Sequence, residues 1–199
     1  MWGQPVTLEG ERVTIRPMEA EDVKDLYEAG RDPQIWTYMP RNIQSLKDME
    51  MLVDEALKRK AQGSEFPFVI YDHKQEMLVG STRFLDISEK DRHLEIGWTW
   101  LSPSVWRTSV NTQCKYLLMK HCFENLAAVR VQLKTDARNI RSQNAIDRIG
   151  GIREGVLRKV VMMPDGHMRD TVYYSILEEE WPKVKEKLER TMLDYRMSL

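Results

Sequence analysis

The chain has 199 residues, 42% of them hydrophobic and 31% charged, a composition typical of a globular protein with a substantial core. Lysine and arginine total 30 against 31 aspartate and glutamate residues, so no overall positive charge indicates a nucleic-acid partner. The start of the chain lacks the basic and apolar parts of a signal peptide, and no apolar run is long enough for a bilayer span. We therefore expect a cytoplasmic protein with a single domain, residues 1–199, and with neither a nucleic-acid nor a membrane partner.

The first third of the chain predicts one strand and two helices. Residues 8–17 contain the alternating apolar and polar side chains of a half-buried strand. Residues 22–29 have one apolar helical face, and residues 45–62 predict a second helix with Ser45 as N-cap and Asp48 three positions later. The aromatic segment between them, residues 35–40, is too short to form a helix with a buried face of its own.

Three strands are expected next, at residues 66–71, 77–86 and 94–101, and their short links predict an antiparallel meander. A short polar loop then leads into a helix at about residues 111–125. A strand followed by a loop and a helix directs free N–H groups and a positive dipole end towards an anion, so this loop is a candidate phosphate site. Cys114 and Cys122 lie eight positions apart on this helix, too far to pair within it, and are expected to be reduced core thiols.

The remaining elements are a strand at residues 130–135, a helix at 139–149 and two strands at 152–162 and 167–177. Asn139 is the expected N-cap of the helix, and the Met-Pro-Asp-Gly turn at 163–166 predicts a hairpin. A helical extension covers residues 179–199. The predicted fold is α/β, with a mixed central sheet of about seven strands in the order β-α-α-β-β-β-α-β-α-β-β and an added C-terminal helix.

Several short motifs, in this order, resemble the GCN5-related N-acetyltransferase (GNAT) superfamily, in its ribosomal-protein N-acetyltransferase (RimJ/RimL)-like branch. They are Glu95-Ile96-Gly97-Trp98, Trp106 with the loop after it, and the segments 139–145, 150–152 and 169–175. The resemblance implies the GNAT fold and transfer of an acetyl group from acetyl-CoA, as co-substrate, to an amine. No metal is expected, because the four histidines lack the spacing of metal ligands.

By this resemblance, backbone amides of the loop would bind the coenzyme A diphosphate. The family pattern is Gln/Arg-x-x-Gly-x-Gly/Ala, and the aligned positions here hold Trp106, Ser109 and Asn111. Glycine permits positive φ without strain, whereas serine loses on the order of 1 kcal/mol there. An ordinary strand-to-helix turn with a polar cap is the alternative interpretation. The expected coenzyme contacts are Trp98, Thr99, Trp100, Leu101, Trp106, Arg107, Thr108, Ser109, Val110, Asn111, Thr112, Asn139 and Ser142.

Two residues are expected to be catalytic, both by the resemblance. Glu95 would take the proton from the attacking amine, since an alkylammonium must lose a proton before it attacks a thioester. The alternative for Glu95 is an ion pair with an arginine such as Arg83 on the neighbouring strand. Ser142 would protonate the departing thiolate. Gly97 is compatible with a bulge that separates its strand from residues 129–135, which would free amides for the coenzyme arm.

The acceptor side is less defined, and the expected contacts are Trp36, Tyr38 and Phe84. A protein N-terminal amine, a small polyamine and an aminoglycoside are all open as acceptors. The alternative function is a degenerate GNAT-fold binding module with weak or no acetyl-CoA turnover, because Ser109 and Asn111 replace small residues of the loop. The protein is expected to be a monomer or a homodimer.

Overall fold

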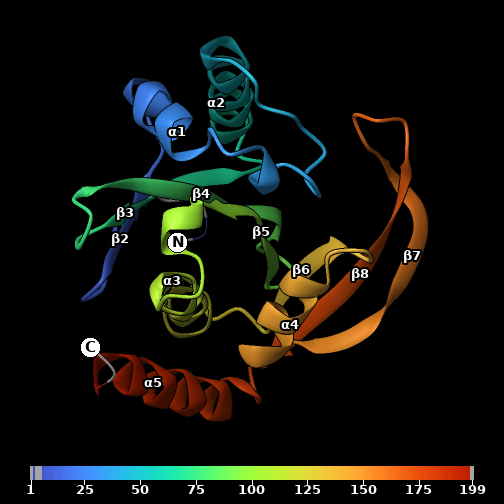
Figure 1. Cartoon of the computed structure of the whole chain (residues 1–199). Helices are drawn as coiled ribbons and strands as arrows, with labels where there is room; N and C mark the ends of the chain where they lie inside the picture. The colour runs from blue at the N-terminus through green and yellow to red at the C-terminus, as the bar shows by residue number, and fades with distance from the viewer. Residues whose placement is uncertain (1, 3–5, 198–199) are drawn as a thin grey trace.

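The computed structural model describes residue 2 and residues 6–197, and it is built around one mixed sheet (Figure 1). Eight strands follow the order β1-β2-β3-β4-β5-β6-β8-β7, and every neighbouring pair is antiparallel except β5 and β6. The strands are β1 (Leu8–Glu9), β2 (Val13–Pro17), β3 (Phe66–Asp72), β4 (Met77–Ser88), β5 (His93–Leu101), β6 (Arg130–Asp136), β7 (Ile152–Met162) and β8 (Met168–Leu177).

Helices cover both faces of the sheet. The helices are α1 (Val23–Ala29), α2 (Leu46–Ala61), α3 (Val110–Lys120), α4 (Ile140–Arg148) and α5 (Trp181–Met197). In Figure 1, α1 and α2 lie on one side of β2–β5, and α3 lies on the other. Short 3-10 turns precede α1, α2 and α3, and a π-helical turn, His121–Asn125, extends α3. No helix in the described part of the chain is long and apolar enough to cross a membrane.

Two hydrophobic cores result, one on each face. The first joins α1 and α2 to the sheet and includes Leu26, Trp36, Met49, Val69 and Trp100. The second joins α3, α4 and α5 to the other face and includes Ile70, Leu118, Ile146, Tyr174 and Leu188. Both free cysteines, Cys114 and Cys122, are buried in this second core. Burial raises the pKa of both thiols, that of Cys114 to about 12, so they are inert packing groups.

The α/β class, the mixed sheet and the element order are those predicted from the sequence, with two differences. The single strand expected at residues 8–17 is divided into β1 and β2 by a turn closed by the Gly10 N–H to Val13 O hydrogen bond of 2.9 Å, which makes eight strands instead of seven. The last five residues of the helix expected to end at 125 are π-helical. The predicted caps are confirmed, because Ser45 and Asp48 form a capping box and Asn139 accepts from the Ser142 amide.

A buried ion pair anchors β4 beside the end of α2. Arg83 on β4 donates to Glu65 at 2.8 Å, and both side chains are almost fully buried. Arg59 on α2 also contacts Glu65, at 2.7 Å. The Arg83 guanidinium lies 4.6 Å from the centre of the Trp98 ring on β5. Glu95 does form an ion pair, as the sequence alternative held, but its partner is Lys134 at 2.9 Å and not Arg83, which is paired with Glu65.

Replacing Glu65 by alanine should lower the free energy of unfolding by about 3–5 kcal/mol, because the buried Arg83 charge would lose its partner. Urea unfolding followed by circular dichroism measures the change. Glu28→Ala is the control, because it removes an exposed pair with Arg31 and should cost less than about 1 kcal/mol. Equal losses in the two variants would contradict this account of Arg83.

Candidate functional site

The site begins where β5 and β6 separate. These strands pair in parallel over three rungs only, and the last joins Glu95 to Gln132. Residues 96–101 of β5 continue along β4 but pair with no other strand in the described part of the chain. The ladder between β4 and β5 is also irregular, with a bulge after Gly97 where Trp98 has a φ of 52°. The bulge and the separation of the strands expected at Gly97 are thus present, with the strained residue one position later.

A cleft of about 1030 Å³ occupies this divergence. Its walls come from β5, the loop after β5, the start of α3, the ends of β6 and β8, α4 and the segment after η2 (Pro33–Ile35). Residues from these elements that were expected to act in catalysis or binding line it together: Tyr38, Glu95, Trp98, Thr99, Trp100, Leu101, Trp106, Arg107, Thr108, Asn111, Asn139 and Ser142. Among the described residues, no cluster of three or more histidine, cysteine or acidic side chains could hold a metal ion.

Glu95 has one oxygen engaged and one available. Its side chain is 1% exposed, and Oε2 accepts from Lys134 and from Gln132, each at 2.9 Å. Its other oxygen, Oε1, has no hydrogen-bond partner within the described chain. A Cβ at Gly97 would lie 2.6 Å from Oε1, so only glycine leaves room for this carboxylate. Glu95 is thus a fixed acceptor that faces the cleft.

The loop after β5 presents free backbone donors. Within the described residues, the N–H groups of residues 107–109, 111 and 112 have no acceptor. The loop is held in place by hydrogen bonds from the Trp106 indole to Leu101 O (2.8 Å) and from the Thr108 hydroxyl to Val105 O (2.7 Å). Such a row of amides at a helix start is suited to an anion.

The strain expected at Ser109 is absent. Ser109 is the N-cap residue of α3 with φ of −69° and ψ of −10°, which is right-handed helical geometry. The residue with positive φ is Arg107, at 61°. The side chains of Ser109, Val110 and Thr112 do not line the cleft, and those of Val110 and Thr112 are buried. Of the contacts expected for these three residues, only those through the free backbone amides of Ser109 and Thr112 remain.

The start of α4 forms the opposite wall. The Asn139 side chain accepts from the Ser142 amide at 3.0 Å, so its role in this structure is that of a cap. The Ser142 hydroxyl has no partner among the described residues, and it faces the cleft. Arg141 stacks over the Trp106 ring at 3.9 Å and thereby connects α4 to the loop after β5.

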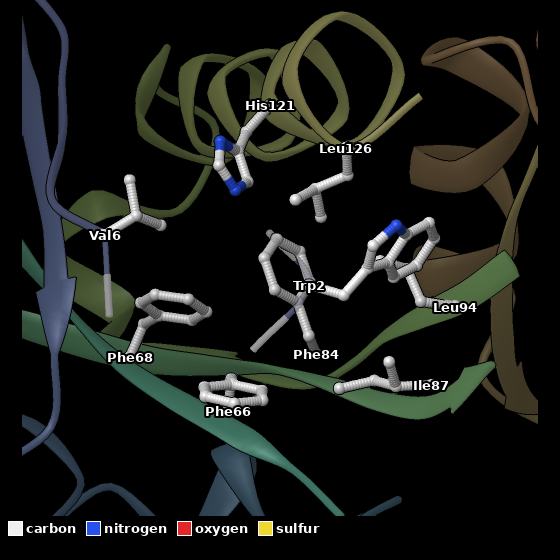
Figure 2. Close-up of a pocket in the computed structure, with 9 residues that line it drawn as sticks. All are labelled: Trp2, Val6, Phe66, Phe68, Phe84, Ile87, Leu94, His121 and Leu126. Atoms are coloured by element: carbon white, nitrogen blue, oxygen red, sulfur yellow. The ribbon is translucent and has the colours of Figure 1, made fainter. Parts of the chain in front are cut away.

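Two of the three expected acceptor contacts lie elsewhere. Phe84 does not line the cleft; it packs against Phe68 and His121 at a small cavity of about 10 Å³, which Trp2 also lines (Figure 2). Trp36 is buried under α1 and α2, where its indole donates to Gly30 O at 2.8 Å. Both corrections have the same cause: Phe84 and Trp36 are each packed into one of the two hydrophobic cores. Tyr38 alone borders the cleft.

Lys115 is a charged residue of α3 inside the cleft wall. Its ammonium donates to the Thr99 hydroxyl at 2.6 Å, and Thr99 in turn contacts Thr82 at 2.8 Å. Burial lowers the pKa of Lys115 to about 8, although Cys114 and Glu95 oppose the shift. The three side chains connect α3 to β4 and to the bulged part of β5.

Comparison with known proteins identifies the family. The family profile described as "Acetyltransferase (GNAT) domain" matches residues 12–152. The chain belongs to the GNAT acetyltransferase family.

Individual relatives agree with this assignment. YnaD of Bacillus subtilis (strain 168), an uncharacterized N-acetyltransferase, is 28% identical over 172 residues, or 85% of this chain and 96% of that one. The ribosomal-protein-serine acetyltransferase of Escherichia coli (strain K12) is 24% identical over 174 residues, which cover 85% of this chain and 96% of that one. A crystal structure of a candidate acetyltransferase from T. thermophilus has a TM-score of 0.86 at 34% identity, covering 96% and 99% of the two chains. Mycobacterium smegmatis RimJ in complex with CoA-disulfide shares the fold, with a TM-score of 0.81 at 20% identity over 95% and 96%.

Some cleft residues of this GNAT domain were not predicted individually. Among them are Lys115, Asp136 and Tyr195. Lys115 looks like an ordinary surface charge in the sequence, and only its position in the folded chain buries it, whereas Arg169 belongs to the 169–175 motif and its burial was not expected. Asp136 ends β6 with 1% exposure; burial favours its neutral form, but hydrogen bonds from Arg138 hold its pKa below the ordinary value.

The burial of Lys115 predicts a specific pH dependence of stability. Between pH 8 and 10.5 the unfolded state binds more protons at this site than the folded state, so stability rises with pH. A shift of this size corresponds to about 3 kcal/mol. Lys115→Met should abolish that rise, and the difference in unfolding free energy between variant and wild type should fall by about 3 kcal/mol from pH 7 to pH 10.5. Denaturant titrations at both pH values test this, with the exposed Lys120→Met as control; a pH-independent difference for Lys115→Met would contradict it.

Proposed function

We propose that this GNAT protein transfers the acetyl group of acetyl-CoA to a primary amine by direct attack of the amine. The observation that carries the proposal is the convergence, in one cleft, of a row of free amides, an unpaired strand edge and a carboxylate with one open oxygen. These are the three parts that acyl transfer from a phosphorylated thioester requires: an anion cradle, donors for the acyl carbonyl and a base.

The coenzyme fits the loop end of the cleft. The free amides of residues 107–112 would hold its diphosphate, with the positive end of the α3 dipole behind them. Arg107, Arg141 and Arg148 line the same end of the cleft and add positive charge for phosphate groups. Trp106 and Arg141, stacked on each other, would border this end of the cleft. The fold likeness to RimJ, whose structure is a complex with CoA-disulfide, supports a coenzyme A thioester as the ligand.

The unpaired part of β5 would hold the arm that carries the acetyl group. Its free amides lie between the loop and Glu95, so an extended arm can pair with them as a missing strand would. Acetyl-CoA would supply a thioester whose acetyl carbon accepts the amine. A β5 amide near the bulge would donate to the acyl oxygen as negative charge develops on it.

Glu95 is the proposed base. Its Oε1 would accept the proton that the acceptor ammonium releases, directly or through one water. Lys134 and Gln132 hold Oε2 and therefore fix the direction of the carboxylate. Gly97 leaves the open oxygen accessible.

Ser142 is the proposed acid. Its hydroxyl is free to donate to the departing thiolate, and the amide of the same residue is anchored by Asn139. The pKa of a thiol is near 8.5, so this proton transfer assists the reaction rather than decides it. The chain thus provides separate groups for the two proton transfers.

The acceptor is a protein N-terminal amine or a small-molecule amine. The E. coli relative is a ribosomal-protein-serine acetyltransferase, which favours a peptide amine. The acceptor side of the cleft, near Tyr38 and Met39, has room for either class.

Asn111→Asp should weaken acetyl-CoA binding about 10-fold or more at low salt, because it adds a negative charge beside the free amides. An acidic residue in the first turn of a helix favours the helix, so the fold should be at least as stable. Isothermal calorimetry with acetyl-CoA and thermal unfolding measure the two effects. Asn125→Asp makes the same change at the exposed far end of the α3 unit and should leave affinity unchanged. Unaltered affinity in Asn111→Asp would remove the diphosphate from this loop.

Glu95→Gln should lower kcat/KM about 10²- to 10⁴-fold, the usual contribution of a positioned base, with acetyl-CoA affinity unchanged. The loss should shrink at high pH, where the acceptor is already deprotonated. A thiol-release assay over an amine panel, run from pH 6.5 to 10, measures both. Glu89→Gln, in the exposed turn between β4 and β5, is the control. A pH–rate profile identical to that of the wild type would exclude Glu95 as the base.

Ser109 in right-handed geometry removes the main reason for the alternative of a binding module without turnover. Calorimetry separates the two functions. Micromolar binding of acetyl-CoA supports the transferase, and no detectable heat at millimolar ligand would exclude it.

A further inference from the structure

Arg169 is a buried cation on the acceptor side of the cleft. It lies on β8 near the hairpin turn, is 7% exposed and lines the cleft. The proposed transfer mechanism makes no use of it. Its position beside the segment after η2 places it away from the amides of the loop that follows β5.

The contacts of Arg169 leave its charge without a paired anion. Its Nε donates to the Thr171 hydroxyl at 3.1 Å, and its Nη1 donates to Tyr38 O at 3.4 Å. No carboxylate in the described part of the chain lies within 4.0 Å of the guanidinium. Asp136 and Glu95 attract it from a greater distance, but the Asp136 carboxylate is engaged by Arg138 at 2.8 Å and the Glu95 carboxylate by Lys134 at 2.9 Å. Burial accordingly lowers the pKa of Arg169.

This arrangement is unfavourable unless a ligand completes it. A buried cation without a partner destabilises a fold by several kcal/mol. The planar guanidinium has five N–H donors, and its two contacts with neutral oxygens leave the others available. An anion that enters the cleft would find a desolvated, directed fork, the strongest kind of site for a carboxylate.

The sheet puts Arg169 and Glu95 on the same side of the cleft floor. Along β8, Arg169, Thr171 and Tyr173 share one face because strand side chains alternate. Across the ladder, Tyr173 is opposite Lys134, and Lys134 reaches back to Glu95 at 2.9 Å. A continuous polar surface therefore runs from the proposed base to Arg169. A molecule whose amine meets Glu95 can extend an anionic group towards β8.

The surroundings of Arg169 favour a carboxylate over a phosphate as the bound anion. Asp136 lies close enough to Arg169 to affect its pKa, so a dianion would meet a nearby negative charge. A carboxylate carries one charge and matches the guanidinium fork with two parallel hydrogen bonds.

We propose that Arg169 binds a carboxylate of the acceptor, so that the acceptor is an amine that also carries a carboxylate. The inference rests on the proposed transfer function and deepens it. Both a free amino acid and a peptide whose second residue is acidic have this chemistry. The carboxylate sets which amine is presented to Glu95, and an amine without one binds less tightly.

Matched acceptors test the proposal. One series compares 4-aminobutyrate and L-alanine with their primary amides. A second compares C-terminally amidated tripeptides that have a free amino terminus and either Glu or Gln at the second position. For at least one series, kcat/KM of the wild type should be 10-fold or more higher for the acid than for its neutral partner. The series that shows the preference identifies the source of the carboxylate.

Arg169→Gln should reduce that ratio to about one, with acetyl-CoA affinity unchanged. Because the ratio is compared between proteins, differences in amine pKa between acid and amide cancel. Arg169→Lys, which keeps the charge but loses the fork, should give an intermediate ratio. Arg158→Gln, an exposed arginine on β7, should keep the wild-type ratio. Thermal unfolding of each variant confirms that it is folded.

Two results would overturn the inference: no preference for acids in the wild type, or a preference that survives in folded Arg169→Gln. Failure of the transfer function itself is recognised separately, as the absence of thiol release with every amine. In that case the same acid and amide pairs are titrated directly by calorimetry. Tighter binding of the acid, lost in Arg169→Gln, supports the carboxylate site, and equal binding of the pair excludes it.

Discussion

The structure depends on the loss of pairing between β5 and β6 after Glu95. Three parallel rungs connect the two parts of the sheet, and beyond them β5 keeps only its β4 neighbour. A strand edge without a partner leaves backbone groups unsatisfied, which in an ordinary sheet is a defect. Here it produces the cleft of about 1030 Å³ and supplies its donors. The loop after β5, the start of α3, and α4 all line this opening.

The opening persists because β5 is held from both faces. On one face Trp100 packs 5.2 Å from Trp36, between the sheet and the α1–α2 layer. On the other face Thr99 is bound by Lys115 of α3. Because strand side chains alternate, the successive residues Thr99 and Trp100 reach opposite layers, and the strand continues past the bulge at Trp98. A buried lysine and a residue at positive φ, each unfavourable by itself, therefore keep β5 away from β6.

Periodicity and capping residues predicted the fold because they are local signals. The Ser45 capping box, the Asn139 cap and the turn at 163–166 each depend on residues within a few positions. The site was predictable where a motif carried it, as at Glu95 and the loop after β5. It was not predictable where tertiary burial decides the role. Phe84 and Trp36 show this for aromatic residues, since sequence alone did not say which layer each one enters. The left-handed residue of the loop, Arg107 rather than Ser109, is likewise a property of the folded backbone.

Arg83 and Arg169 show how burial separates a structural charge from a functional one. Both are nearly buried, and burial lowers the pKa of each. Arg83 is compensated by Glu65 at 2.8 Å and lies under the Trp98 ring, so its charge is neutralised within the fold. Arg169 has hydroxyl and carbonyl partners only, and it faces the cleft. An uncompensated buried cation lowers the stability of the free protein. A ligand anion that pairs with it removes this cost, and the recovered free energy contributes to the affinity of the complex. Of these two guanidinium groups, the one without a carboxylate within 4.0 Å in the described part of the chain, Arg169, is the one that lines the cleft.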